Sequence, residues 1–489
     1  MRSTRATVVL LAVFGLLIGA RSSEAALTGN AWISLDTEGN QFGAASGAYS
    51  YPPSLSSDGL LVALESIAPL DFEVDQNDVG DVFLRDTTAS QTSIVSVNSS
   101  GEPGNNRSYG PSLSGDGLFV AFESLASNLA EGDGNNVSDV FLRDLADGAT
   151  LRVSAPAGGG AANGSSYRPS ISGDGSFVAF CSRASNLVAD DANGVADVFV
   201  WQRATGAISR ISVPSASQAA SDGCLRVSAN GAGNVVAFAA VTDGSARVFV
   251  YDQATGTTTS LGPEANGPSG TSGLSISGDG RLVAFDSVAD NLITDDSNRS
   301  RDVFLRDLDA DTTSRVSVRS SGSQLPGDSG SSGVSLSRDG RFVVFGSTAR
   351  GVVPGDSNGR EDIFRRDLAA GQTLIASVNV FGESANNSSY SPAISADGLV
   401  VAFTSLAANL IAGDTNRQAD VFLRGTEFPE TAGSSSGPEE TGAPAEESTA
   451  PVPQDDGGPG KVVVYVGIAV SILVLLVVAS LLLGRRGRA

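Results

Sequence analysis

A motif of acidic and amide side chains, Asp-x-Asn-x-x-x-Asp, recurs six times along the chain. The copies are Asp75, Asn77 and Asp81; Asp133, Asn135 and Asp139; Asp191, Asn193 and Asp197; Asp296, Asn298 and Asp302; Asp356, Asn358 and Asp362; and Asp414, Asn416 and Asp420. Calcium takes six to eight oxygen ligands from carboxylates, amides and backbone carbonyls, and alternating Asp and Asn in a turn can supply them. The motif therefore predicts Ca²⁺ as a cofactor.

Two of the copies carry a further acid two positions upstream, Glu73 and Glu131. With it, the spacing is similar to the calcium loops of integrin-type propellers, so we expect the tightest sites there. A second interpretation needs no metal. Asp and Asn side chains accept hydrogen bonds from the backbone two residues further on, and a network of such Asx turns would cap the loop and start the next strand. Both interpretations stay open at this point.

Four of the seven tyrosines occupy one equivalent position, two residues before a proline: Tyr51, Tyr109, Tyr167 and Tyr390. A ring with an apolar body and a phenol suits contact with a glycan or a peptide. The four are therefore candidate ligand-binding residues, expected to form a crescent around one side of a channel mouth. The alternative is packing beneath the neighbouring loops.

The sequence contains no histidine and two cysteines, Cys181 and Cys224. Without histidine, Ser-His-Asp and Cys-His nucleophile systems and His-ligated zinc or iron are excluded. The two cysteines follow one strand and open another in neighbouring repeats, where we expect them on the same face. A disulfide is one outcome in an exported protein, and two buried thiols are the other.

These residues are positioned by a repeat about 60 residues long, in which Ser-x-Asp-Gly and a Val-Ala-Phe run precede Asp-Val-Phe-Leu-Arg-Asp. Seven copies can be aligned. The fourth is degenerate, with Val227 to Asn230, Val235 to Phe238 and Val248 to Tyr251 in place of the usual runs. Each copy offers four short apolar runs bounded by Gly, Asp, Asn and Ser, which predict strands joined by tight turns. Four antiparallel strands repeated at a fixed period are typical of propeller blades.

The seventh copy has three strands, and a fourth is predicted at the other end of the chain, Trp32 to Leu35. The two ends would then complete one blade and leave no open sheet edge. The sequence predicts an all-β fold, a seven-bladed β-propeller over residues 27–427 closed by an N-terminal strand.

The flanking segments predict export and anchoring. Residues 1–25 have the charged start, apolar run and small-residue cleavage site of a signal peptide. Residues 428–460 read as a disordered acidic stalk rich in Pro, Ser and Gly, residues 461–484 as a transmembrane helix, and residues 485–489 as a basic cytoplasmic tail. The expected localisation is single-pass in the cell membrane, with the propeller on the extracytoplasmic side. An alternative is removal of the span by a sorting protease.

The repeat Ser-x-Asp-Gly-x-x-Val-Ala-Phe followed by Asp-Val-Phe-Leu-Arg-Asp resembles the TolB-type propeller repeat of bacterial envelope proteins over residues 32–424. The resemblance implies the fold and leaves function open, because propellers serve many functions. A net charge of −23 excludes nucleic acid as a partner. We expect a non-catalytic surface propeller that binds an envelope or extracellular protein or a glycan. The alternatives are an extracellular hydrolase or lyase acting on polysaccharide or peptide, and a purely structural envelope protein.

Overall fold

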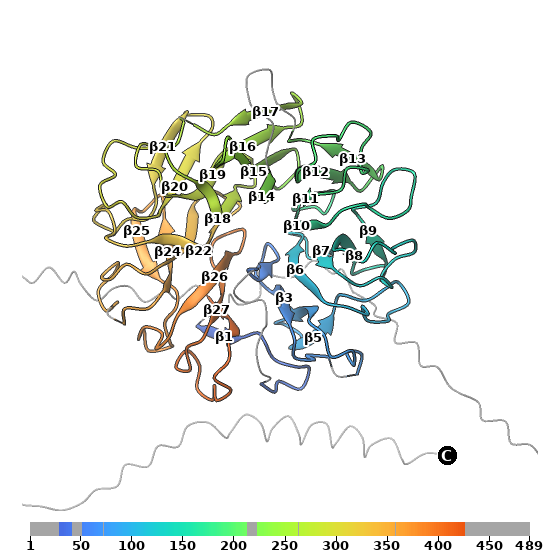
Figure 1. The fold of residues 1–489 in the computed structure, drawn as a ribbon. Coiled ribbons are helices and arrows are strands. Elements are labelled where there is room, and N and C mark those ends of the chain that lie inside the picture. The colour runs from blue at the N-terminus through green and yellow to red at the C-terminus, as the bar shows by residue number, and fades with distance from the viewer. Residues whose placement is uncertain are drawn as a thin grey trace, which may run out of the picture. The chain divides into compact units, whose positions relative to one another are not determined.

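The chain folds into seven four-stranded antiparallel sheets arranged around a central axis (Figure 1). This computed structural model describes residues 29–41, 51–71, 73–212, 223–262, 264–356 and 358–425. The predicted signal peptide, stalk, transmembrane helix and basic tail lie outside the described residues. Within the described residues, no helix is long and apolar enough to cross a membrane. The prediction of a seven-bladed β-propeller is confirmed.

Each blade uses consecutive strands from the channel outward, except the last. Blades one to three contain β2 (Ser54–Leu55), β3 (Leu61–Ser66), β4 (Asp81–Asp86) and β5 (Gln91–Ile94); β6 (Ser108–Leu113), β7 (Phe119–Ser124), β8 (Asp139–Asp144) and β9 (Thr150–Arg152); and β10 (Ser166–Ile171), β11 (Phe177–Ser182), β12 (Asp197–Gln202) and β13 (Ala207–Arg210). Blades four to six contain β14 (Gly223–Ala229), β15 (Val235–Thr242), β16 (Ser245–Asp252) and β17 (Thr257–Ser260); β18 (Ser269–Ile276), β19 (Leu282–Ser287), β20 (Asp302–Asp307) and β21 (Thr312–Arg315); and β22 (Ser329–Leu336), β23 (Phe342–Ser347), β24 (Asp362–Asp367) and β25 (Gln372–Ile375). Blade seven contains β26 (Ser389–Ile394), β27 (Val401–Ser405), β28 (Asp420–Arg424) and β1 (Asn30–Trp32).

The Ser-x-Asp-Gly sequence makes the turn between the first and second strands of a blade because its two polar side chains hold the backbone. In blade two, Ser114 Oγ donates to Asp116 Oδ1 at 2.5 Å, and the same carboxylate accepts the N–H of Leu118 at 3.0 Å. Gly117 has a φ of 73°, a conformation that glycine adopts without strain. The turns between third and fourth strands lie at the same end. The longer loops therefore all emerge on the opposite face, which we call the loop face.

The core lies between blades and is built on phenylalanines of the second and third strands. In blade two Phe122 of β7 pairs in register with Phe141 of β8, and their ring centroids are 5.8 Å apart. Both side chains are fully buried. Equivalent Phe pairs occur in blades three to seven. The Val-Ala-Phe and Asp-Val-Phe runs are thus the packing signal of the repeat.

The N-terminal strand β1 closes the ring by pairing with β28, two residues earlier in the sequence than predicted. Asn30 pairs with Arg424 and Trp32 with Phe422, whereas the expected strand ran from Trp32 to Leu35. The strand ends early because the Ser34 hydroxyl donates to the buried Asp420 carboxylate at 2.6 Å. From there the chain turns away.

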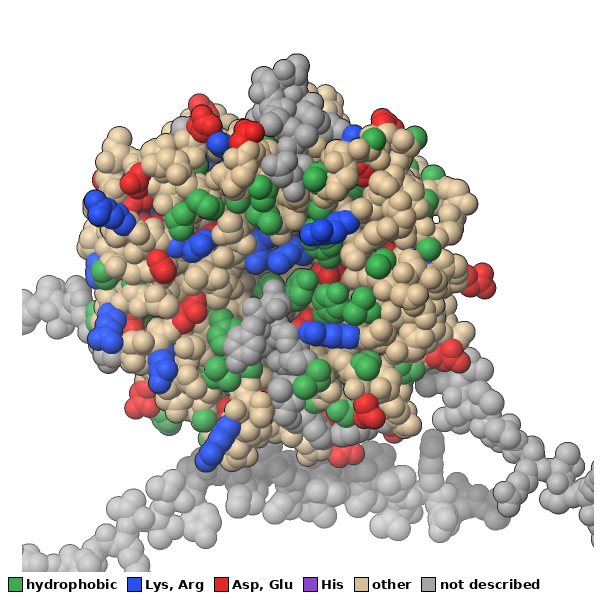
Figure 2. All heavy atoms as spheres, viewed as in Figure 1, with side chains coloured by type: hydrophobic (Ala, Val, Ile, Leu, Met, Phe, Trp, Pro, Cys, Tyr) green, Lys and Arg blue, Asp and Glu red, His purple; other side chains and the backbone are tan. Residues whose placement is uncertain are grey.

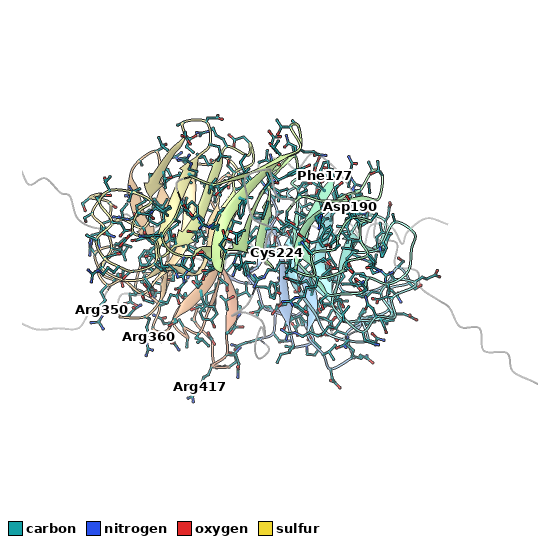
Figure 3. All side chains as sticks on the ribbon, turned by 45° about the horizontal axis from the view of Figure 1, so that its top comes forward. Phe177, Asp190, Cys224, Arg350, Arg360 and Arg417 are labelled. Carbon is teal, nitrogen blue, oxygen red and sulfur yellow. A yellow bond between two sulfur atoms is a disulfide. The ribbon has the colours of Figure 1, made fainter. Side chains whose placement is uncertain are left out.

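The two cysteines form a disulfide in this structure, joining β11 of blade three to β14 of blade four. Their Cα atoms are 5.7 Å apart, and Cys224 lies within the body of the propeller (Figure 3). The bond adds a covalent link between adjacent blades. It closes a segment of 43 residues.

Replacing Ile33 by Ala should lower the free energy of unfolding by about 2–4 kcal/mol, because this side chain is only 1% exposed and packs where the two chain ends meet. Chemical denaturation of the propeller measures the change. The exposed Thr37→Ala on the following turn is the matched control and should change little. Equal stability of Ile33→Ala and the parent protein would contradict closure by this segment.

Replacing both cysteines, Cys181→Ala with Cys224→Ala, should destabilise the propeller by roughly 2–4 kcal/mol, since a loop of this length loses substantial entropy when it is cross-linked in the unfolded chain. The measurement is guanidinium denaturation with and without reductant. The parent protein should lose stability on reduction, and the variant should not. A parent protein indifferent to reductant, with two alkylatable thiols, would contradict the link.

Candidate functional site

The innermost strands of the seven blades line one central cavity of about 310 Å³. Its walls are mostly proline, serine, glycine and aliphatic side chains. Among the described residues that line it, the charged ones are Arg168, Arg226 and Arg338. In a chain with a net charge of −23, this channel is therefore a local region of positive charge. Figure 2 shows basic side chains gathered near the middle of the face in view.

Arg168 stands at the loop-face end of the channel in an unusual backbone conformation. Its φ is 54°, which costs a non-glycine residue on the order of 1 kcal/mol. The conformation belongs to a bulge in β10, where the register shifts between Tyr167 and Ser170. The bulge turns the N–H of Arg168 toward Glu123 Oε1, at 2.6 Å, and places its guanidinium 5.7 Å from the ring centroid of Tyr51.

Arg226 of β14 lies at the same level of the neighbouring blade. Its Nε donates to the carbonyl of Thr271 at 3.2 Å. Burial, together with the nearby positive charge of Arg168, lowers the pKa of Arg226 to about 10. The charged form of Arg226 is thus destabilised by its surroundings, so an anion in the channel would relieve that cost.

The opposite end of the channel is closed by seven backbone hydrogen bonds, each joining the tight turn of one blade to that of the next. The bonds run from Ser57 N to Gly115 O, Asp116 N to Gly173 O, Gly173 N to Gly231 O, Gly231 N to Gly278 O, Gly278 N to Arg338 O, Asp339 N to Ala396 O and Ala396 N to Ser57 O, at 2.8–3.2 Å. The ring is complete. It fixes how closely the seven inner turns approach the axis.

Arg338 places its guanidinium across this ring. A Cβ on Gly115 would lie 3.4 Å from Arg338 Cζ, and one on Gly173 would overlap Nη1. The glycines of these turns therefore leave the space that the guanidinium occupies. Burial lowers the pKa of Arg338, and the carboxylates of Asp116 and Asp174 partly offset that effect.

Between the two ends, serines on the channel wall link successive inner strands. Their hydroxyl oxygens accept a backbone N–H from the next blade at 2.9–3.2 Å: Ser54 from Leu113, Ser112 from Ile171, Ser170 from Ala229, Ser228 from Ile276 and Ser275 from Leu336. Each accepting oxygen still carries a proton. The serines can therefore donate hydrogen bonds to a ligand in the channel.

Two buried glutamates lie behind the wall at the loop-face end. Glu123 is 1% exposed and also bonds to the Tyr51 hydroxyl, and Glu65 accepts the N–H of Gly110 at 3.2 Å. Burial raises the pKa of each to about 7. Close to neutral pH they therefore change between neutral and negative, which changes the net charge beside Arg168.

The structure brings together only part of the predicted tyrosine crescent. The rings of Tyr51 and Tyr109 are 5.6 Å apart, and Tyr51 lines the channel. Tyr167 is partly buried, with its hydroxyl 3.3 Å from the carbonyl of Cys224, and Tyr390 is 6% exposed. The burial of Tyr390 fits the packing alternative, whereas Tyr51, Tyr109 and Tyr167 are all partly exposed. The ligand-binding role remains a prediction for the four tyrosines.

The six Asp-x-Asn-x-x-x-Asp loops share one network of protein hydrogen bonds. In every copy the Asn side-chain nitrogen donates to the last Asp at 2.6–3.0 Å. The same Asp accepts a serine hydroxyl at 2.5–2.6 Å. The Asn oxygen accepts a backbone N–H two residues on, for example that of Val79 at 3.0 Å. This is the arrangement that the Asx-turn interpretation describes.

The first Asp of the motif also has protein partners in most blades. Arg152, Arg210 and Arg315 lie 3.1–3.6 Å from Asp133, Asp191 and Asp296, and Gln41 donates to Asp414 at 3.0 Å. Glu73 and Glu131 are exposed. The described residues form no group of three or more acidic, Cys or His side chains suited to a metal ion. Calcium binding stays a prediction, and it would require these side chains to turn.

The three channel arginines were not singled out from the sequence, although their positions carry a signal. Arg338 stands in Ser-Arg-Asp-Gly, where other copies of the turn have Gly, Ser or Ala. Arg168 stands between Tyr and Pro, where blade two has Gly110. A substitution of a small residue by arginine at a position facing the axis marks a charge in the channel.

Comparisons with known proteins bear on the fold. No protein-family model and no curated protein matches the sequence. Among solved structures, an oligogalacturonate lyase in complex with manganese aligns with 83% of this chain and 99% of its own, at 13% identity and a TM-score of 0.50. TolB from Acinetobacter baumannii aligns at 17% identity and a TM-score of 0.36, over 60% of this chain and 58% of TolB. The chain thus spans little more than half of TolB. At these identities the similarity shows the β-propeller fold alone.

Glu123→Gln should change how stability depends on pH. Since the folded pKa of Glu123 is raised from an ordinary 4.5 to about 7, the folded state binds this proton more tightly than the unfolded chain. Its contribution is complete below pH 4.5 and is lost as pH rises through 7. The variant should flatten this decline by roughly 1–3 kcal/mol between pH 5 and 8, measured by denaturation at each pH.

The exposed Glu131→Gln is the control for this experiment and should keep the decline of the parent protein. An unchanged pH profile in Glu123→Gln would show that the carboxyl group is ionised throughout the range.

Proposed function

We propose that the chain is a non-catalytic binding protein whose central channel takes a ligand carrying carboxylate or phosphate groups. The observation that carries this proposal is that the charged side chains on the described channel wall are all arginines. Guanidinium groups match the planar or tetrahedral oxygens of such anions with paired hydrogen bonds. In a narrow channel with low-dielectric walls, this attraction is stronger than at an open surface.

The wall also favours binding over hydrolysis or elimination. Its polar groups, as far as the structure describes them, are hydroxyls, backbone groups and guanidiniums. These groups donate hydrogen bonds and hold charge. The carboxyl groups of Glu65 and Glu123 lie behind the wall, where they accept backbone N–H groups of the inner strands. Asp286 of blade five is placed in the same way, since it accepts the N–H groups of Ser272 and Gly273. The hydrolase or lyase alternative would need a carboxyl group of this kind to reach a substrate.

We further propose that the ligand is met outside the cytoplasm, by a TolB-like propeller tethered to the membrane. Three observations support this: the signal-peptide pattern of residues 1–25, the uncharged run from Val462 to Leu483, and the Cys181–Cys224 disulfide, which suits an oxidising compartment.

Titration calorimetry with citrate and pyrophosphate at fixed ionic strength tests channel binding. Arg226→Gln should weaken binding at least about tenfold, as expected when one charge-assisted hydrogen bond is lost. The control is Arg360→Gln, on an outer loop of blade six (Figure 3), which should bind as the parent protein does. Equal affinity in all three proteins, or heat that disappears entirely in moderate salt, would contradict a channel site.

Affinity for sulfate, an anion whose own charge does not change over this range, should fall as pH rises from 6 to 8. Glu123, with a pKa of about 7, becomes negative over this range beside Arg168 and reduces the positive potential at the loop-face end. In Glu123→Gln the fall should be smaller, and what remains comes from Glu65, whose pKa is also raised to about 7. Tighter binding at higher pH would contradict this electrostatic account.

A further inference from the structure

The positive charge of the channel is divided between its two ends. Arg168 and Arg226 lie at the loop-face end, held there by the contact with Tyr51 and the hydrogen bond to Thr271. Arg338 lies at the tight-turn end, among Gly115 and Gly173. Both groups line the same cavity. A ligand with one acidic group can contact only one of them at a time.

The separation of the two ends follows from the strands between them. Gly173 lies five positions after Arg168 in the sequence, and Gly231 lies five positions after Arg226. At ~3.3 Å per residue a fully extended strand would place the two levels roughly 16 Å apart, and the bulge in β10 shortens this distance. Allowing for the reach from each guanidinium to a bound anion at both ends, two acidic groups roughly 8–12 Å apart would engage both.

The wall between the two ends supplies hydrogen-bond donors. The oxygen of each linking serine accepts a backbone N–H, so its own O–H remains able to donate a hydrogen bond. Within the part of the chain that the structure describes, these hydroxyls donate no hydrogen bond. A purely hydrocarbon segment would leave these hydroxyls without an acceptor in a narrow channel. A segment with ether, hydroxyl or carbonyl oxygens would satisfy them.

From these three observations we infer that the ligand is an elongated molecule with an acidic group at each end and oxygen acceptors between them. The inference rests on the proposed function and adds the shape of the ligand. One acid group binds Arg168 and Arg226, the other binds Arg338 at the closed end, and the middle lies along the serines. Arg338 is then a specificity residue, because only a ligand long enough to reach it gains the second contact.

A set of three small diacids of equal charge and one monoacid tests the length requirement. The probes are diglycolate, which is short; dioxaoctanedioate, which is longer and carries two ether oxygens; suberate, its all-carbon counterpart; and methoxyethoxyacetate, which has one acid group only. Calorimetry on the propeller should give dioxaoctanedioate at least about tenfold tighter binding than diglycolate or the monoacid. Suberate should bind more weakly than dioxaoctanedioate.

Two variants test whether Arg338 binds the second acidic group of the ligand. Arg338→Gln should bind dioxaoctanedioate no better than diglycolate. Gly173→Ala removes the same contact without changing Arg338, because the added Cβ displaces the guanidinium. This variant too should lose the length preference. A melting curve and circular dichroism show that each variant is folded. Arg360→Gln should keep the preference.

The outcomes separate the two proposals. If no anion binds, the proposed function is wrong. If all the anions bind alike and neither Arg338→Gln nor Gly173→Ala changes their order, the channel is an anion site but the two-ended ligand is wrong. If suberate binds as tightly as dioxaoctanedioate, the serines do not contact the ligand and the acceptor requirement is overturned.

Discussion

The ring of seven backbone hydrogen bonds at the tight-turn end is the constraint on which the channel depends. Each inner turn both donates to and accepts from its neighbours, so no turn can move outward without leaving a polar backbone group unpaired. The last blade joins this ring through Ala396, and its sheet is completed at the outer edge by β1 from the N-terminus, which pairs with β28. The seven blades are therefore closed both at the axis, by the inner turns, and at the rim, by the two chain ends.

The same ring explains why small residues occupy the second position of most Ser-x-Asp-Gly turns. Side chains at this position point toward the axis, where seven of them would collide. Glycine in blades two, three and four leaves room for one long side chain, and Arg338 takes it. A single large residue thus requires small ones in the other blades. The cost of holding a guanidinium there is reduced by Asp116 and Asp174. At the other end, Glu123 has a comparable relation to Arg168.

Much of the fold could be predicted from sequence because the repeat places the same packing and turn residues in most blades. The Phe of Val-Ala-Phe has the same role in blades two to seven, and the Ser and Asp of the turn have the same roles in all blades except the degenerate fourth. The early end of β1 could not be predicted, since it depends on the bond from Ser34 to Asp420, which lies far along the chain. The Asp-x-Asn motif was found, but whether its oxygens face an ion or protein donors depends on partners such as Arg210 and Gln41 that no local spacing specifies.

The candidate site was less predictable because it arises where the blades differ. The repeat pattern consists of what the copies share, whereas Arg168, Arg226 and Arg338 are departures from it. The four tyrosines share one position in the repeat, but their surroundings differ: Tyr390 is buried, whereas Tyr167 is partly exposed and bonds to the backbone of blade four. Residues that face the axis of a closed ring meet one another regardless of their distance in sequence. Which of these residues lie close together can therefore be seen only in the folded structure.

The most direct test of an anion-binding channel is a crystal of the propeller soaked in selenate, an oxyanion whose selenium gives an anomalous signal. The account predicts two peaks on the channel axis, one beside Arg168 and Arg226 and one beside Arg338. Peaks found only at exposed arginines such as Arg360 and Arg417 (Figure 3), with none in the channel, would contradict it.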